Sequence, residues 1–95
     1  TSLFTPSHKT KKWYTKAAEQ GDADAQFNLA VMYDNGLGVL QDNVYAHVWL
    51  NIASSNGSET AGKNRDLVAK RMTPDQIAEA QRLARECVKK DYKNC

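Results

Sequence analysis

The chain has 95 residues, of which 25% are charged, and its formal net charge is +2. This length permits one compact domain or a short repeat array with a small core, and the mild charge does not by itself indicate a nucleic-acid-binding protein. No apolar run approaches the roughly 18 residues that a transmembrane helix needs. No signal peptide is visible, although a mature chain would have lost one.

Helical spacing of apolar residues, together with capping signals between the runs, predicts an all-α chain. Asp22 and Asp42 each precede a periodic apolar run, and their carboxylates can accept free backbone N–H groups as N-caps. Thr73 marks the clearest helix start, because Pro74 suits the first helical position and Gln76 can close a capping box. In chain order, the expected helices span residues 6–20, 23–35, 43–55, 59–71 and 74–90.

The stretch NGLGVLQD, residues 35–42, lies between the second and third predicted helices. An Asn-Gly pair can form a hairpin turn, but the flanking residues have helical periodicity and do not alternate. A phosphate-binding loop would follow a strand and carry a Lys-Ser/Thr pair or a third glycine, and this stretch has neither. We therefore predict a joint between two helices, in which Gly36 ends one helix and Asp42 caps the next.

The sequence contains an internal repeat. Trp13 aligns with Trp49 and Gly21 with Gly57 at an offset of 36 residues, and the shared frame is W-x3-A-x3-G-x3-A-x2-N. A period in the middle thirties is typical of helix-pair repeats. We therefore expect Trp13 and Trp49 to occupy equivalent core positions in two stacked helix pairs.

Patterns typical of catalysis, metal binding or cofactor binding are not found, so we expect no catalytic residues, no metal and no cofactor. His8 and His47 have no cysteine, histidine or carboxylate at metal-ligand spacing, and we expect His47 at the surface or edge of its helix. Asp34 and Asp42 flank the glycine loop and are better explained as a helix end and an N-cap than as a catalytic pair. No serine lies in a G-x-S-x-G elbow.

A basic cluster on the first predicted helix surrounds Trp13. Its members are Lys9, Lys11, Lys12 and Lys16. Aromatic residues interleaved with basic ones are typical of proteins that bind single-stranded nucleic acid. Because we assign Trp13 to the repeat core, we favour a solvated helix face and expect no nucleic acid partner. Binding of an anionic polymer or nucleic acid through this helix remains an alternative.

The two cysteines, Cys87 and Cys95, permit two interpretations: free thiols, or one disulfide that closes a small C-terminal loop. If the helix continued to residue 95, eight steps of about 1.5 Å would separate the two Cα atoms by about 12 Å. That separation is too large for a disulfide. A bridge therefore requires the helix to stop near Lys89 or Lys90 and the tail to fold back.

Residues 25–57 follow the pattern A-x2-N-L-A-x2-Y-x2-G-x-G-V-x2-D-x3-A-x2-W-x3-A-x3-G, which resembles the Sel-one-like repeat (SLR) family. This family is similar to tetratricopeptide repeats in its helix-turn-helix unit. Two positions depart from the pattern: Ala30 replaces the usual Gly, and Arg65 stands where the next copy should have Leu, which puts the regularity of helix 59–71 in doubt. The resemblance divides the single domain into a half repeat (5–21), a full repeat (22–57) and a degenerate repeat with a capping helix (58–95).

The resemblance implies a fold, a role and a location. The fold is a right-handed α/α superhelix, a solenoid of about five helices, and the role is that of a non-catalytic adaptor that binds a protein or peptide. The closing stretch looks like the capping helix of bacterial members, which favours the Cys87–Cys95 disulfide and a periplasmic or secreted location over a cytoplasmic one. A repeat-based hydrolase is a further alternative, and a homodimer is compatible with so short an array.

A stacked helix-pair array leaves an extended concave surface that suits a peptide or a partner helix. If Leu29 and Tyr33 face inward, one acidic and apolar half of this surface comes from the second helix. One basic and apolar half comes from the fourth helix at the 36-residue offset. The expected binding residues are Asp24, Phe27, Val31, Asp34, Asn35, Thr60, Lys63, Leu67, Lys70 and Arg71.

Overall fold

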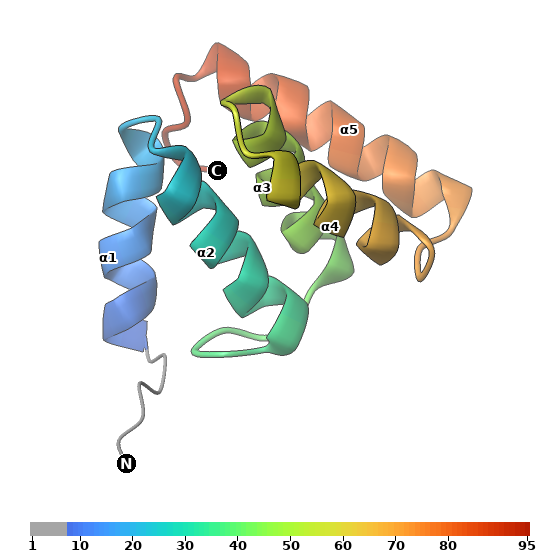
Figure 1. Cartoon of the computed structure of the whole chain (residues 1–95), viewed down its shortest axis with the longest axis horizontal. Helices are drawn as coiled ribbons and strands as arrows, with labels where there is room; N and C mark the ends of the chain where they lie inside the picture. Colours follow the sequence, from blue (N-terminus) through green and yellow to red (C-terminus); the bar gives the residue numbers. More distant parts are fainter. Residues whose placement is uncertain (1–7) are drawn as a thin grey trace.

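The computed structural model describes residues 8–95, and within them the chain forms five α-helices and no strand (Figure 1). The helices are α1 (His8–Glu19), α2 (Ala23–Asn35), α3 (Asn43–Ser55), α4 (Glu59–Ala69) and α5 (Pro74–Lys89). The all-α prediction is confirmed, and α2 and α3 have the expected bounds. Helices α1 and α5 end one residue earlier than predicted, and α4 ends two residues earlier. Residues 6 and 7 of the first predicted helix lie outside the described range.

The helix starts are fixed by the predicted capping side chains. Asp42 Oδ1 accepts a hydrogen bond of 3.1 Å from the backbone N–H of Tyr45 at the start of α3. At the start of α5, Thr73 Oγ1 accepts from the N–H of Gln76, and the Gln76 side chain accepts from the N–H of Thr73. Both predicted halves of the capping box are therefore present.

The glycine stretch joins two helices, as predicted. Gly36 ends α2 in the left-handed conformation, with φ of 66°, and its N–H donates to the carbonyl of Met32. The loop closes where the N–H of Asp42 donates to the carbonyl of Tyr33 over 2.9 Å. A Cβ atom at position 36 would lie 3.3 Å from Gln41 Cβ, so both conformation and space favour glycine here.

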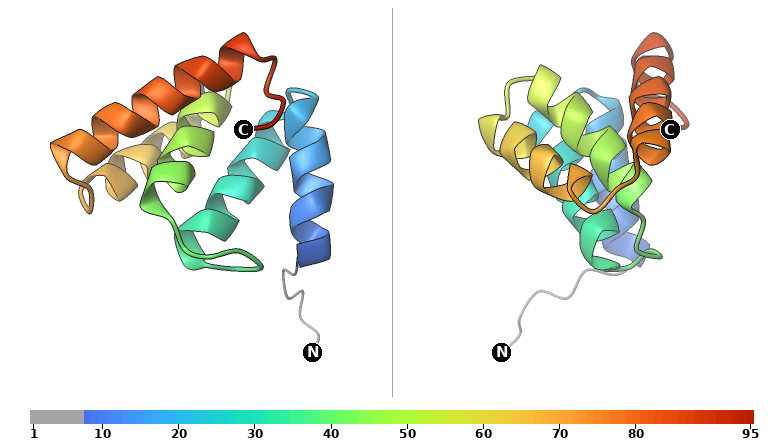
Figure 2. Two further views of the ribbon diagram at one scale, coloured as in Figure 1. Left: turned by 180° about the vertical axis from the view of Figure 1, so that it is seen from behind. Right: turned by 90° about the vertical axis from the view of Figure 1, so that its right-hand side faces the viewer.

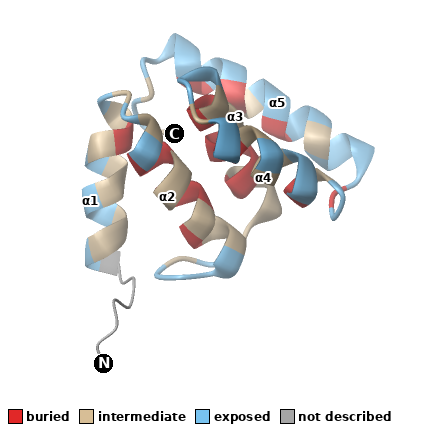
Figure 3. Cartoon of the chain, in the orientation of Figure 1, coloured by how far each residue is buried: buried red, intermediate tan, exposed pale blue. Residues whose placement is uncertain are grey.

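Helix α3 is the centre of the molecule and packs against α2, α4 and α5, whereas α1 packs against α2 (Figures 1 and 2). Residues on every side of α3 are buried, and Figure 3 shows further buried positions on its neighbours. The largest fully buried side chains are Leu29, Leu50, Ile52, Gln26, Val48, Val68 and Cys87. The last residues of the chain fold back from α5 toward the turn between α1 and α2 (Figure 2).

The two tryptophans lie in unlike surroundings, so the prediction that both are core residues is wrong for Trp13. Trp49 is 3% exposed in the central helix, whereas Trp13 is 77% exposed on α1. The cause is the number of neighbours, because α3 is enclosed by three helices and α1 has a strong contact with α2 alone among the described elements. The backbone repeat persists, since Gly21 and Gly57 both have positive φ, at 89° and 109°.

Candidate functional site

The face predicted to bind a partner is formed by α2 and by α4 with the residues that follow it. Both helices lie nearer the viewer than α3 in Figure 1. On the α2 side, Phe27, Val31 and Asp34 are half-buried, whereas Asp24 and Asn35 are exposed. The residues of the other half are all exposed: Thr60, Lys63, Leu67, Lys70 and Arg71. We call these ten residues the α2–α4 face.

One end of the α2–α4 face is closed by an ion pair. The guanidinium of Arg71 pairs with the carboxylate of Asp34, and its Nη2 also donates to Asn43 Oδ1 over 3.2 Å. These contacts link the end of α2, the start of α3 and the segment after α4. Two of the opposite charges predicted on this face therefore neutralise each other, which leaves Asp24 on α2 and the two lysines Lys63 and Lys70 outside this ion pair.

The most exposed apolar residue of the α2–α4 face is Leu67, which is 56% exposed. Lys63 precedes it by one helical turn and Lys70 follows it by one turn, so all three share one side of α4. Neither lysine forms an ion pair within residues 8–95. An exposed leucine between two unpaired cations can contact an apolar side chain that is flanked by carboxylates.

A groove between α3 and α5 was not predicted from the sequence. Its volume is about 380 Å³, and it is lined by Asn51, Ile52, Ser55, Ala84, Arg85, Val88 and Lys89. Ile52 is 1% exposed and Val88 is 47% exposed. Val88 could have indicated this groove from the sequence, because it is an apolar residue one turn after Ala84 and lies beside the buried stripe of α5.

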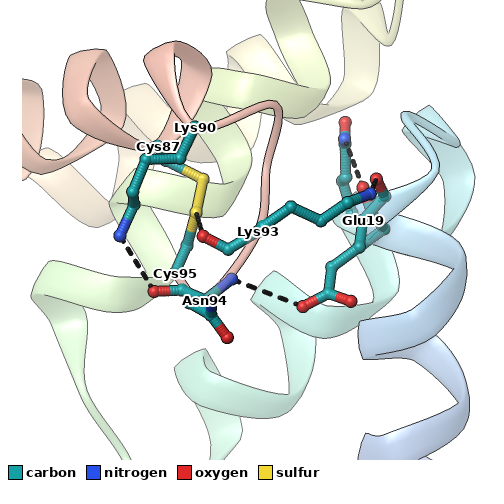
Figure 4. Close-up of a disulfide and its surroundings, with 8 residues drawn as sticks. Glu19, Cys87, Lys90, Lys93, Asn94 and Cys95 are labelled. Atoms are coloured by element: carbon teal, nitrogen blue, oxygen red, sulfur yellow. Dashed lines mark hydrogen bonds between the residues drawn. A yellow bond between two sulfur atoms is a disulfide. The ribbon is translucent and has the colours of Figure 1, made fainter.

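The C-terminal tail is fixed by the predicted disulfide. Cys87 and Cys95 are bonded, with their Cα atoms 5.6 Å apart, because α5 ends at Lys89 and the chain turns back (Figure 4). Inside the loop that the bridge closes, Lys93 Nζ donates to the carbonyl of Glu19 over 2.7 Å, at the end of α1. The disulfide therefore holds the tail against the first helix.

A series of hydrogen-bonded polar side chains also joins the C-terminal tail to the first helices. Gln26 is fully buried, and its Nε2 donates to the carbonyl of Ala18 on α1 over 3.0 Å. Its Oε1 accepts from Asn56 Nδ2 over 2.9 Å, and Asn56 Oδ1 accepts from the hydroxyl of Tyr92 over 3.3 Å. One buried amide thus connects α1, α2, the turn after α3 and the tail.

Comparison with known families identifies the repeat. The family model described as the Sel1 repeat matches residues 7–22 and 23–58, which together make up more than half of the chain. The chain belongs to the Sel1 repeat family. Sel1 repeats generally form protein-interaction scaffolds without a catalytic role. Comparison with curated proteins gave no match.

A solved structure with the same fold supports this assignment. The Sel1 repeat chain is similar to c5321, a protective antigen of uropathogenic Escherichia coli strains whose crystal structure is described as displaying an SLR fold. The TM-score is 0.83, the sequence identity is 32%, and the match covers 90% of this chain. The same match covers 19% of that protein, so the chain spans about a fifth of its length.

The two departures from the Sel1 repeat pattern are accommodated without disturbing the helices. Arg65 stands where leucine is expected, yet α4 is regular from Glu59 to Ala69. The Arg65 side chain turns outward along α3, where its Nη1 donates to Asn51 Oδ1 over 2.8 Å. Ala30 is fully buried, so its methyl group fits the close helix contact where other repeats have glycine.

His47 is buried at 3% exposure, and the expectation of a surface or edge position is wrong. It lies on α3, the central helix, which packs against α2, α4 and α5. Its Nδ1 has no hydrogen-bond partner among the described residues. Burial lowers the pKa of His47, the charge of Arg65 lowers it further, and Asp66 acts in the opposite direction.

The described residues also bear on metal and membrane sites. Between residues 8 and 95, no group of three or more His, Cys, Asp or Glu side chains could hold a metal ion. None of the described helices has the length and apolar character that crossing a membrane requires.

Proposed function

We propose that this Sel1 repeat chain is a non-catalytic interaction module that binds a protein or peptide segment across the α2–α4 face. The observation that carries the proposal is the exposure of Leu67 between Lys63 and Lys70. On α2, the half-buried Phe27 and Val31 offer further apolar surface to a partner. Two rigid helices held by a shared core can bind a segment without reorganising, which lowers the entropic cost of binding.

The charges on this face define the partner that suits it. Lys63 and Lys70 favour carboxylates next to the partner's apolar residue, and Asp24 favours a basic residue where the partner contacts the start of α2. The Asp34–Arg71 pair is already satisfied within the chain and acts as a fixed boundary. A partner whose apolar residue has acidic neighbours, and which also carries a basic residue for Asp24, therefore fits best.

Selection of binders from a library of random peptides, with a counter-selection against the variant Lys63→Glu/Lys70→Glu, tests this proposal. We expect selected peptides to lose affinity by about tenfold or more on the double variant Lys63→Glu/Lys70→Glu, and also on Leu67→Ser. The matched control is Lys9→Glu/Lys12→Glu, which changes the net charge by the same amount on α1. Peptides that bind all these variants with equal affinity would show that the α2–α4 face is not the site.

We also propose that the chain resides in the periplasm or outside the cell. The support is the Cys87–Cys95 disulfide, because such bonds persist in oxidising compartments and are reduced in the cytosol. Alkylation of thiols in intact host cells, followed by a gel-shift assay, measures the state of the two cysteines. Two alkylated thiols in unstressed cells would contradict this location.

A further inference from the structure

The outer side of α1 carries an aromatic residue in a basic surround. Trp13 is 77% exposed, and a shallow depression of about 500 Å³ around it is lined by Lys9, Lys11, Lys12, Thr15 and Lys16. Lys9, Lys12 and Lys16 precede and follow Trp13 within one helical turn, so the four residues share one side of the helix. We call them the Trp13 face.

The lysines of the Trp13 face repel one another, and no acidic residue of the described part of the chain neutralises them. Helix α1 has no acidic residue in its first turn, and none of its lysines forms an ion pair within residues 8–95. Lys12 and Lys16 are four residues apart, where like charges repel. Lys9 lies in the first turn, at the positive end of the helix dipole, which disfavours a cation. A bound group with negative charge would relieve these repulsions.

The repeat shows what kind of element covers this side of a helix. At the 36-residue offset, Lys9, Lys12 and Lys16 correspond to residues of α3. The α3 counterparts are Tyr45, Val48 and Ile52. All three line spaces shared with α5, so in α3 this side is covered by a helix. Helix α1 keeps the tryptophan but replaces each of the three apolar residues with lysine.

We propose that the Trp13 face is a second docking surface, which binds an acidic amphipathic helix of a partner protein. The partner helix would lie along the exposed side of α1 that carries Trp13. An apolar side chain would cover the indole of Trp13, and Asp or Glu residues one turn apart would pair with Lys9, Lys12 and Lys16. This surface is separate from the α2–α4 face and does not depend on it.

The dimensions of the face favour a helix over a nucleic acid. Lys9 to Lys16 span about 10 Å along α1, which is about two turns of a helical partner. Single-stranded nucleic acid is bound by several aromatic platforms along a positively charged groove. The Trp13 face offers one exposed indole on one helix, and the whole chain has a net charge of only +2.

The test uses the full chain and a library of random peptides displayed on phage, with a counter-selection against the variant Lys9→Glu/Lys12→Glu/Lys16→Glu. We expect the enriched peptides to form helices on binding and to carry acidic residues at intervals of three or four around an apolar residue. A synthetic peptide of the enriched sequence should bind the wild-type chain and lose about tenfold or more in affinity on Trp13→Ala. The same peptide with Gln in place of its acidic residues should lose binding as well.

Two matched measurements separate this proposal from the alternatives. Lys63→Glu/Lys70→Glu carries two of the same charge changes on α4 and should bind the α1 peptide with unchanged affinity. This control therefore distinguishes a wrong assignment of the Trp13 face from a wrong assignment of the α2–α4 face. Circular dichroism checks that each variant is folded. Enriched peptides without acidic residues, or peptides that bind Trp13→Ala as well as wild type, would overturn the proposal. Tighter binding of oligothymidylate than of the peptide would also overturn it.

Discussion

Lys93 donates a hydrogen bond from its ammonium group to the backbone carbonyl of Glu19 over 2.7 Å, so the tail of the chain caps the end of its first helix. Lysine suits this position because the carbonyls at a helix C-terminus are unsatisfied and carry the negative end of the dipole. The two residues are 74 positions apart in the sequence. It exists because the Cys87–Cys95 bridge turns the tail back from α5.

Removal of the bridge should therefore destabilise the chain and release the tail. For a loop with a sequence separation of 8, the chain-entropy model gives a loss of about 2–3 kcal/mol in the free energy of unfolding. Urea denaturation of Cys87→Ala/Cys95→Ala against the oxidised wild type measures it. The control is wild type with reductant, which should lose a similar amount. A thiol assay that detects two free cysteines in the purified protein without reductant would contradict the disulfide.

The buried amide of Gln26 should be the most sensitive polar position in the chain. Gln26→Leu keeps the approximate volume but leaves the Ala18 carbonyl without its donor, which should cost about 1–3 kcal/mol. Tyr92→Phe removes the outermost hydrogen bond of the same series of side chains, at a more accessible position. It should therefore lower the free energy of unfolding less than Gln26→Leu does. Thermal or urea denaturation gives the ranking. If Tyr92→Phe were the more harmful change, the buried amide would not be the centre of the network.

Short-range signals were sufficient to predict the helices. The caps at Asp42 and Thr73 and the stop at Gly36 act over three or four residues, so the bounds followed from local sequence. The surroundings of Trp13 could not be predicted in this way, because its sequence position is equivalent to that of Trp49. Burial of each indole depends on how many helices enclose it, and that number differs between α1 and α3.

The burial of His47 could have been predicted from the composition of its helix. The segment NVYAHVWLNIASS contains no Asp, Glu, Lys or Arg, and a helix without charged residues on any side is buried all round. The contacts of Gln26 with Asn56 and of Asn56 with Tyr92 join residues 30 and 36 positions apart. Nothing in the local sequence indicates such pairs, so these hydrogen bonds could not be predicted from the sequence.

Gly36 should be the least replaceable residue of the glycine loop. Its φ of 66° is unfavourable for any residue with a Cβ atom, and the added methyl would approach Gln41. Gly36→Ala should lower the free energy of unfolding by about 1 kcal/mol or more. Gly36→Asn is the matched control, because asparagine tolerates the left-handed region better, and it should cost less. Equal stability of Gly36→Ala and wild type in urea denaturation would count against the loop conformation.

The lowered pKa of His47 makes stability depend on pH. The unfolded chain takes up a proton on this histidine near its usual pKa of about 6.5, whereas the folded chain resists protonation until lower pH. The unfolded state therefore binds more protons in this window, and the free energy of unfolding should fall as pH drops from 7 to about 5.5. Above the usual pKa, both states hold the neutral imidazole and this contribution is constant.

The variant His47→Phe isolates this effect. His47→Phe removes the titrating group, so its stability should change less between pH 7 and about 5.5 than that of wild type. The comparison uses the slope with pH and not the absolute stability, since the new ring can also change the packing around α3. Parallel slopes for wild type and His47→Phe would show that His47 is protonated equally in both states.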